Sequence, residues 1–317
     1  MPVSAALIEE HKFINRLQTA LMLAGIAFVL GLAGWSFGGL PMMLNLLFAG
    51  VLLLLISPRL SPRLILRMYR AEPLEGVPEL TRIVAELARR AGLPRPPALY
   101  HVPSRLLNAF AVGSPDDAAI AVTDAMLHKL TLRELSGVLA HEISHIRHND
   151  LRVMSMADAL SRLTQSFSLV GQLMLFMNLP LILGGYGRIS WLGIFLLIFA
   201  PQITALLQLA LSRTREYDAD LGAVELTGDP EGLASALAKL EREQRGFMEQ
   251  IFLPNRRNPE PSLLRTHPPT EERIRRLLAL RPRRADRLVL VDHPLRLGSR
   301  LQPPARLPHR HLWGNWY

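Results

Sequence analysis

The residues His141-Glu142-Ile143-Ser144-His145 form an HExxH pattern. On a helix, the two imidazoles would lie one turn apart on the same face, a spacing at which both can bind one zinc ion. Glu142 would then lie beside the metal, where its carboxylate can take a proton from the attacking water. Two solvated histidines on a surface helix produce the same pattern. The motif therefore predicts a zinc hydrolase if the surrounding chain supplies a helix and a further ligand.

The residues before the motif are typical of the start of a helix. Thr131 and Glu134 have the S/T-x-x-E spacing of a capping box. Apolar residues then recur at helical spacing, at Leu135, Val138, Leu139, Ile143 and Ile146. We expect HExxH to lie inside this helix, which could continue through residues 151–160 towards the next apolar stretch.

A catalytic zinc site needs a third protein ligand besides the two histidines. The metzincin pattern would place a histidine at position 151, where this chain has Leu151. Glu216 and Asp220 are four residues apart and would share a helix face, so that Glu216 can bind zinc while Asp220 holds the far nitrogen of a ligand histidine. The alternative is an acidic helix end that makes ordinary salt bridges with Arg213 and Arg215. The chain has no cysteine, which excludes thiolate-bound metals and thiol nucleophiles.

The apolar residues, 49% of the chain, are gathered in blocks. Residues 17–58, 163–187 and 189–212 contain no charged side chain, and the first block is long enough for two spans of about 20 residues. Residues 34–41 and 180–188 are rich in glycine and proline, as expected of turns. We therefore predict four transmembrane helices in two pairs.

The distribution of basic residues predicts the orientation of these helices. Basic residues flank one end of every predicted span, at Lys12, Arg16, Arg59, Arg63, Arg67, Arg70, Arg152, Arg162, Arg213 and Arg215, whereas the turns at the other end contain only Arg188. We expect a multi-pass membrane protein with both termini and HExxH in the cytoplasm, and with the first helix retained as an anchor. The net charge of +9 is explained by contact with anionic lipid, and no nucleic-acid partner is expected.

Outside the apolar blocks the pattern predicts a small α+β domain. Residues 78–92 read as an amphipathic helix, and 97–102, 107–112 and 118–122 as strands of a small antiparallel meander. Asp229 and Pro230 are typical of a helix N-cap and first helical position. The predicted fold is a mainly α membrane protein with a zincin-like α+β protease domain. Its expected segments are 1–58 (two spans), 59–162 (protease part), 163–212 (two spans), 213–282 (protease part) and 283–317 (a basic tail).

Four segments in order resemble HtpX-type membrane zinc metalloproteases, whose superfamily includes the CAAX prenyl proteases. They are 108–113 (NAFAVG), 139–146 (LAHEISHI), 212–220 (SRTREYDAD) and 266–274 (THPPTEERI). The resemblance implies that His141, His145 and Glu216 bind one zinc ion and that Glu142 is the general base. The predicted hairpin before Glu216 would have to bring that residue back to the histidines.

The resemblance also suggests how substrate is held. The segment that contains Asn108, Ala109, Phe110 and Ala111 is a candidate edge strand that could pair with an extended peptide. The alternative is a core strand with Phe110 packed inward. His267 and Arg273 are candidates for substrate or transition-state contacts. Their alternatives are a loop residue before a helix and a solvated helix charge.

The expected activity is that of a zinc endopeptidase at the cytoplasmic face of a bacterial inner membrane, and its expected partners are protein substrates and the bilayer. The resemblance implies that it cleaves damaged or misfolded membrane proteins. Two alternatives are a processing protease for a prenylated or signalling partner and a catalytically silent membrane adaptor.

Overall fold

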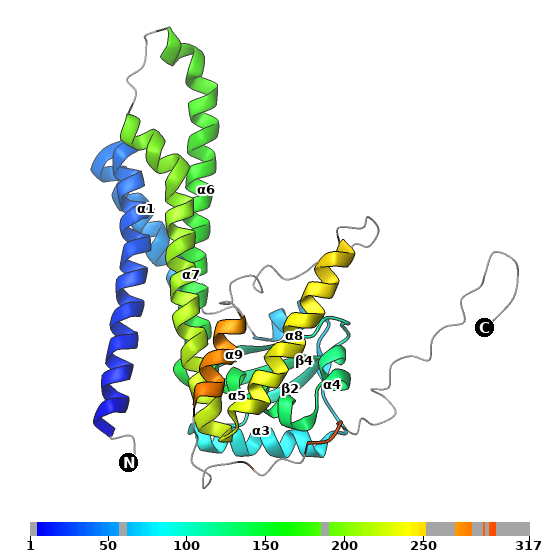
Figure 1. Cartoon of the computed structure of the whole chain (residues 1–317). Coiled ribbons are helices and arrows are strands. Elements are labelled where there is room, and N and C mark those ends of the chain that lie inside the picture. The colour runs from blue at the N-terminus through cyan, green and yellow to red at the C-terminus, as the bar shows by residue number, and fades with distance from the viewer. Residues whose placement is uncertain are drawn as a thin grey trace, which may run out of the picture. The chain divides into compact units, whose positions relative to one another are not determined.

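The computed structural model describes residues 5–56, 62–184, 190–251, 270–280, 288 and 292–295 (Figure 1). The chain forms two compact units, one of residues 1–64, 145–220 and 257–273 and one of residues 65–144, 221–256 and 274–317. The elements are α1 (Ala5–Ile56), α2 (Pro62–Met68), β1 (Glu72–Pro73), α3 (Pro78–Ala91), β2 (Ala98–Val102), β3 (Ala109–Ser114), β4 (Asp117–Thr123), α4 (Asp124–Lys129), α5 (Leu132–His148), α6 (Asp150–Leu183), α7 (Trp191–Thr227), α8 (Pro230–Ile251) and α9 (Thr270–Ala279).

Helix α1 is a helical hairpin. Its backbone leaves the helical conformation at Gly38 and at Gly39, where φ is +62° and favours glycine. A Cβ atom on Gly31 would lie 3.5 Å from the side chain of Leu47. In one straight helix these residues would be about 24 Å apart, at about 1.5 Å of rise per residue. The chain therefore folds back at the turn predicted within residues 34–41 (Figure 1).

Helices α6 and α7 are joined by polar contacts at a point where a proline interrupts the backbone ladder. Pro201 has no N–H, so the carbonyl of Leu197, four residues earlier, has no intrahelical donor. Gln172 Nε2 on α6 donates to this carbonyl over 2.8 Å, and Ser168 Oγ donates to it as well. An orphaned carbonyl would be costly in lipid, and the two α6 side chains remove that cost.

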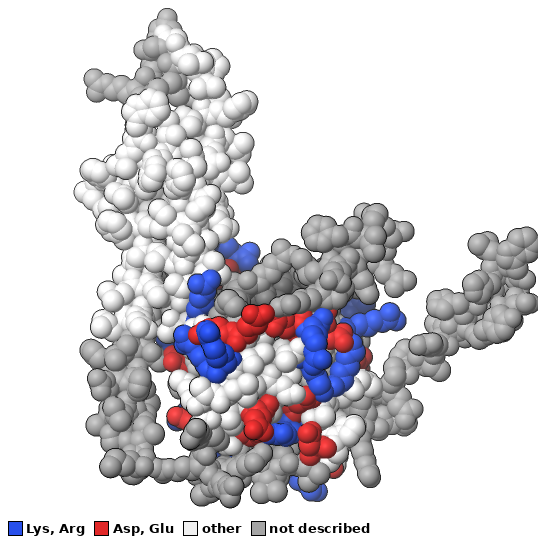
Figure 2. All heavy atoms as spheres, viewed as in Figure 1, with Lys and Arg blue, Asp and Glu red and all other residues white. Residues whose placement is uncertain are grey.

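Two helical stretches of the described chain, Leu17–Leu53 and Trp191–Thr227, are long and apolar enough to cross a membrane. Only 28% of each apolar window is buried, which distinguishes them from core helices of a soluble protein. On the face shown in Figure 2, the upper part of the column that α1, α6 and α7 form carries no charged side chain. Of the four predicted spans, the described helices therefore support two apolar stretches, and the division into four stays a prediction. The stretch of α1 contains the Gly38–Gly39 kink, and α6, although uncharged from residue 163, carries the polar residues Gln165, Gln172 and Asn178.

The second unit contains a four-stranded sheet in the order β1-β2-β4-β3. The predicted antiparallel meander is wrong, because β2 and β4 are parallel, with Ala98 opposite Ala119, while β3 and β4 form an antiparallel hairpin. The connection 103–108 leaves a gap between β2 and β3, and β4 later occupies this gap and pairs with both strands. Strand β4 is apolar from Ala118 to Val122 and buried after its first two residues, as is typical of a central strand covered on both faces. Strand β3 is left at the end of the sheet.

Helix α3 matches the predicted amphipathic helix. Its buried residues include Leu80, Ile83, Val84 and Leu87, the apolar positions of the sequence pattern. The helix ends at Gly92, whose φ of +69° gives the left-handed cap for which glycine is the favoured residue.

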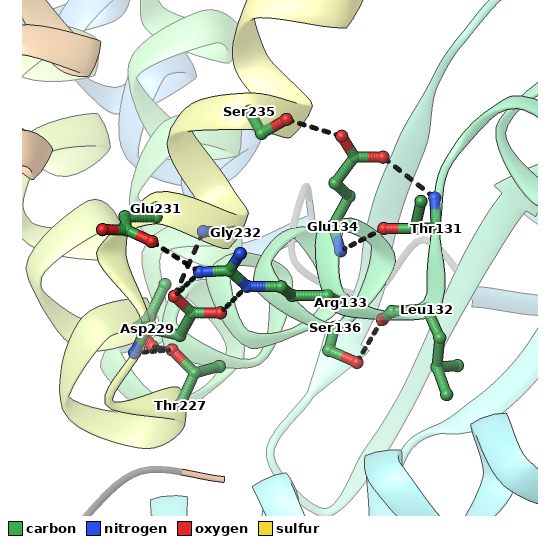
Figure 3. A network of polar contacts seen from close by, with 11 residues as sticks. Thr131, Leu132, Arg133, Glu134, Ser136, Thr227, Asp229, Glu231, Gly232 and Ser235 are labelled. Atoms are coloured by element: carbon green, nitrogen blue, oxygen red, sulfur yellow. Dashed lines mark hydrogen bonds and ion pairs between the residues drawn. The ribbon is translucent and has the colours of Figure 1, made fainter. Parts of the chain in front are cut away.

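The start of α5 is fixed to α8 by a polar network (Figure 3). The capping box is confirmed, since Thr131 N–H donates to Glu134 Oε2 over 2.9 Å and Glu134 N–H donates to Thr131 Oγ1 over 3.3 Å. Glu134 also accepts hydrogen bonds from Ser235 and Lys239 of α8. Asp229 caps α8 through Gly232 N–H and receives two hydrogen bonds from Arg133, at 2.5 and 2.7 Å. The helix that carries HExxH is therefore held at its first turn.

Part of the predicted tail is described. Leu288 N–H donates to the carbonyl of Thr227 over 2.7 Å, and His293 C=O accepts from Leu132 N–H over 2.9 Å. The remainder of 283–317 lies outside the described residues.

Candidate metal centre

Three potential metal ligands come together, two on α5 and one on α7. The HExxH segment lies within α5, as predicted, so that His141 and His145 are one helical turn apart. Each of His141, His145 and Glu216 offers one ligand atom, and these atoms lie within 4.8 Å of one another. His145 Nε2 is 3.7 Å from Glu216 Oε1. The residues predicted as the three ligands are thus the ones that converge.

The geometry of these donors fits zinc. Tetrahedral zinc with bonds of about 2.0–2.2 Å to nitrogen and oxygen places neighbouring ligand atoms about 3.3 Å apart, close to the distance between His145 and Glu216. His141 and Glu216 are each only 6% exposed, so a cation held here would be largely screened from water. Two imidazoles and one carboxylate with no sulfur ligand are a donor set that zinc accepts.

The buried charges around these ligands favour a cation. Three carboxylates, those of Asp150, Glu216 and Asp220, are buried together with two guanidinium groups, those of Arg215 and Arg273. Three negative charges less two positive ones leave one net negative charge, which favours a bound cation over an anion.

Asp150 contacts Nδ1 of the candidate ligand His145, the ring nitrogen that would not bind the metal. Its Oδ2 lies 3.0 Å from His145 Nδ1, and the carboxylate is buried. The prediction that the HExxH helix runs on through residues 151–160 is wrong, because α5 ends at His148. Asn149 has a φ of +60°, which asparagine tolerates better than most residues, and α6 begins at Asp150. The break turns the Asp150 side chain back towards the helix that it follows.

Asp220 and Arg273 form a buried pair. Arg273 Nε and Nη2 donate to the two carboxylate oxygens of Asp220 over 2.8 and 2.7 Å, and Arg273 Nη1 lies 3.0 Å from Glu216 Oε2. Arg273, predicted as a substrate or transition-state group, thus contacts the third ligand. A hydrogen bond donated by one of the candidate ligand histidines to Asp220 stays a prediction. His267 lies outside the described residues.

Glu142 is joined to the edge strand. Ala111 N–H donates to Glu142 Oε2 over 3.0 Å. Asn108 C=O accepts from Thr123 N–H, so the ladder bonds of β3 fall on residues 108, 110 and 112, and the N–H and C=O groups of 109, 111 and 113 point away from β4. Phe110 packs on Tyr69, with ring centroids 4.9 Å apart. Strand β3 therefore lies at the sheet edge and also contributes Phe110 to a core.

Comparison with known proteins assigns the chain to a family. The family model described as "Peptidase family M48" matches residues 76–281. The chain belongs to peptidase family M48. It is 37% identical to Protease HtpX of Legionella pneumophila subsp. pneumophila (strain Philadelphia 1) over 285 residues, 84% of this chain and 99% of that protein. It is 33% identical to the Protease HtpX homolog of Methylibium petroleiphilum over 293 residues, 85% of this chain and 99% of that protein.

Among solved structures, S. mikatae Ste24p is similar with a TM-score of 0.44 and 22% identity, covering 86% of this chain and 66% of that chain. The M48 match and the HtpX relatives confirm the resemblance inferred from the four motifs. With its apolar helices, the chain is a membrane metalloprotease with His141, His145 and Glu216 as possible metal ligands.

Sequence reasoning missed two residues next to the ligands. Asp150 follows His145 by five residues, beyond the reach of one continuous helix turn, and only Asn149 signals that the helix breaks between them. Arg215 was considered as a partner of nearby acids on its own helix, but its guanidinium contacts Asp150, at the start of α6.

Proposed function

We propose that this protein is a zinc endopeptidase that cleaves damaged or misfolded membrane proteins at the cytoplasmic face of a bacterial inner membrane. The observation that carries the proposal is the convergence of His141, His145 and Glu216 on one point, with Glu142 next to His141 on α5. The M48 match and the HtpX relatives support the reaction class.

In the proposed reaction, His141, His145 and Glu216 hold the zinc ion. When bound, zinc would polarise the scissile carbonyl and make water easier to deprotonate. Glu142 takes the proton from the attacking water and passes it to the nitrogen of the leaving amine, so that the peptide bond breaks. The hydrogen bond from Ala111 N–H orients the Glu142 carboxylate for this transfer.

The substrate is proposed to bind as an extended strand along β3. The strand lies at the end of the sheet, and the backbone groups of residues 109, 111 and 113 point away from β4. Within the segment Asn108 to Ala111, hydrogen bonds to the backbone groups of residue 109 and to the carbonyl of residue 111 would hold a peptide largely independently of its sequence, as a protease acting on misfolded proteins requires. His267 is proposed as an oxyanion or substrate contact.

The membrane location is proposed to involve four spans, with two from α1 and one each from α6 and α7. Side chains on all three helices are apolar and exposed, including Phe28, Phe48, Phe176 and Trp191. The basic residues outside the apolar blocks favour a cytoplasmic active site.

The test compares detergent-purified wild-type protein with the Glu142→Gln variant and with Glu75→Gln, an exposed control. We expect all three to contain one zinc ion per chain, and Glu142→Gln to cleave an unfolded membrane protein about 10²–10⁴-fold more slowly. Cleavage by Glu142→Gln at the wild-type rate would refute the general-base assignment.

Two further arms of this experiment address the alternatives. Faster cleavage of a prenylated peptide than of the unfolded membrane protein would favour a processing protease. Absence of chelator-sensitive cleavage by the wild type would favour an adaptor.

A further inference from the structure

Arg215 is a buried guanidinium on α7, directly before the ligand Glu216. It is 7% exposed, and its Nη1 donates to Asp150 Oδ1 over 3.0 Å. Its Nη2 donates to Thr19 Oγ1, on the first arm of α1. Thr19 is also buried, two residues inside the apolar stretch that begins at Leu17. The guanidinium therefore connects three helices, α1, α6 and α7.

The other oxygen of Asp150 faces the metal ligand. Asp150 Oδ2 lies 3.0 Å from His145 Nδ1, so that one carboxylate joins the imidazole to the guanidinium. If Nδ1 donates its hydrogen to Asp150, then Nε2 of His145, which is 3.7 Å from Glu216 Oε1, keeps the lone pair that a metal ligand needs. Both the tautomer and the ring orientation of the ligand then depend on where the carboxylate is held.

We propose that Thr19, Arg215 and Asp150 are positioning residues that orient His145 for metal binding, so that the N-terminal membrane helix is part of the support of the metal centre. This inference rests on the proposed zinc function. A buried ion pair need not stabilise the fold, because the cost of desolvating the two charges offsets most of their attraction. A positioning role explains why the Asp150–Arg215 pair lies between a ligand and a membrane helix.

The chain offers a control for the change at Asp150 and another for the change at Thr19. Asp158, eight residues beyond Asp150 on α6, pairs with Arg162 over 2.7 Å and shows no contact with His145 in the described structure. Thr164 is a buried threonine of α6 whose hydroxyl donates to the carbonyl of Leu160. Asp158→Asn and Thr164→Val therefore repeat the chemical changes of Asp150→Asn and Thr19→Val away from the ligand.

The experiment measures zinc dissociation constants of full-length protein in detergent by competition with a chromogenic chelator. It also measures the visible absorption of the cobalt-substituted protein and the thermal midpoint of the metal-free protein. We expect Asp150→Asn to bind zinc about 10–100-fold more weakly and to change the cobalt spectrum. Arg215→Lys and Thr19→Val should weaken binding by up to about tenfold, the equivalent of one net hydrogen bond. The two controls should match the wild type.

The proposal is overturned if Asp150→Asn and Thr19→Val bind zinc as tightly as their controls. It is also overturned if they only lower the metal-free midpoint, because that result describes a purely structural pair. In either case the proposed function would still hold, provided that the wild type binds zinc and the His141→Ala variant does not. Absence of zinc binding by the wild type would instead refute the proposed function. Should Asp150→Asn fail to fold, Arg215→Lys and Thr19→Val decide the question.

Discussion

Replacing Arg273 by methionine tests whether this residue supports the metal ligands or contacts the substrate. The guanidinium is 4% exposed and makes three contacts of 2.7–3.0 Å with Asp220 and Glu216, themselves 5% and 6% exposed. Methionine fills similar space but leaves both carboxylates buried without this cation. Removing one partner of a buried ion pair costs about 3–5 kcal/mol.

The cost should depend on the metal. In the metal-free protein both carboxylates lose their positive partner, and we expect the thermal midpoint of Arg273→Met to fall by about 6–20 °C, at about 2–4 °C per kcal/mol for a domain of this size. With zinc bound, the cation still compensates the charge of Glu216, so the loss should be smaller. Measuring both midpoints in detergent, one with a chelator and one with excess zinc, gives the difference.

Arg276→Met is the matched control, because Arg276 is an exposed residue on the same helix. A surface substitution of this kind should change the unfolding free energy by no more than about 0.5 kcal/mol. If Arg273→Met unfolds at the same temperature as this control but raises KM for the peptide, the supporting role is refuted. Arg273 would then act on the substrate, as the family resemblance implied.

Two further changes test the protease unit. Burial alone would raise the pKa of Glu134, but hydrogen bonds from Lys239, Ser235 and the Thr131 N–H outweigh it and hold the pKa below its ordinary value. Its stabilising effect is therefore complete above the ordinary glutamate pKa of about 4.3 and is lost as the pH falls through the folded-state pKa. In metal-free protein, Glu134→Gln should cost about 1–3 kcal/mol at pH 7 and progressively less as the pH falls below about 4.3, and a cost that does not shrink on acidification would contradict this. Gly113 has a φ of +97°, and a Cβ there would lie 2.0 Å from the carbonyl oxygen of Asp117. Gly113→Ala should therefore lower the midpoint more than Gly76→Ala, whose φ is +81° with open space around it, and equal effects would contradict the clash.

Local signals in the sequence predicted the helix that carries the two candidate histidine ligands. The capping box at Thr131 and Glu134 is formed by neighbouring residues, and the HExxH spacing fixes two ligands within one helix. The buried face of α3 and the cap at Asp229 are likewise determined by residues close together in the chain. These features depend on short-range geometry, which a sequence specifies directly.

The strand order and the number of transmembrane spans depend on how distant segments pack, which the local sequence pattern does not specify. The three predicted strands exist, but their order depends on which strand is buried on both faces, and only the uniform apolarity of β4 indicates this. Counting uncharged residues predicts a span in α6 as well, although its glutamine and asparagine side chains are uncharged but not apolar, and that span stays a prediction.

The contacts behind the metal ligands were beyond sequence reasoning for a similar reason. Arg215 is 65 residues from Asp150 and 196 from Thr19. The acidic residues that follow Arg215 on its own helix were equally plausible partners for its charge. Only the packing of α1, α6 and α7 against one another selects the acid that also contacts His145.

The hydrogen bond between Ala111 and Glu142 links two roles that the sequence treats separately. On β3 the outward backbone groups belong to residues 109, 111 and 113, and the N–H of Ala111 is engaged by the carboxylate of the proposed base. A peptide strand added to this edge would seek the same N–H group. Substrate pairing along the whole strand then requires Glu142 to release Ala111, whereas pairing through residues 109 and 113 leaves the contact intact. In the second case, the hydrogen bond from the Ala111 N–H keeps the Glu142 carboxylate oriented for the proton transfer while the peptide is bound.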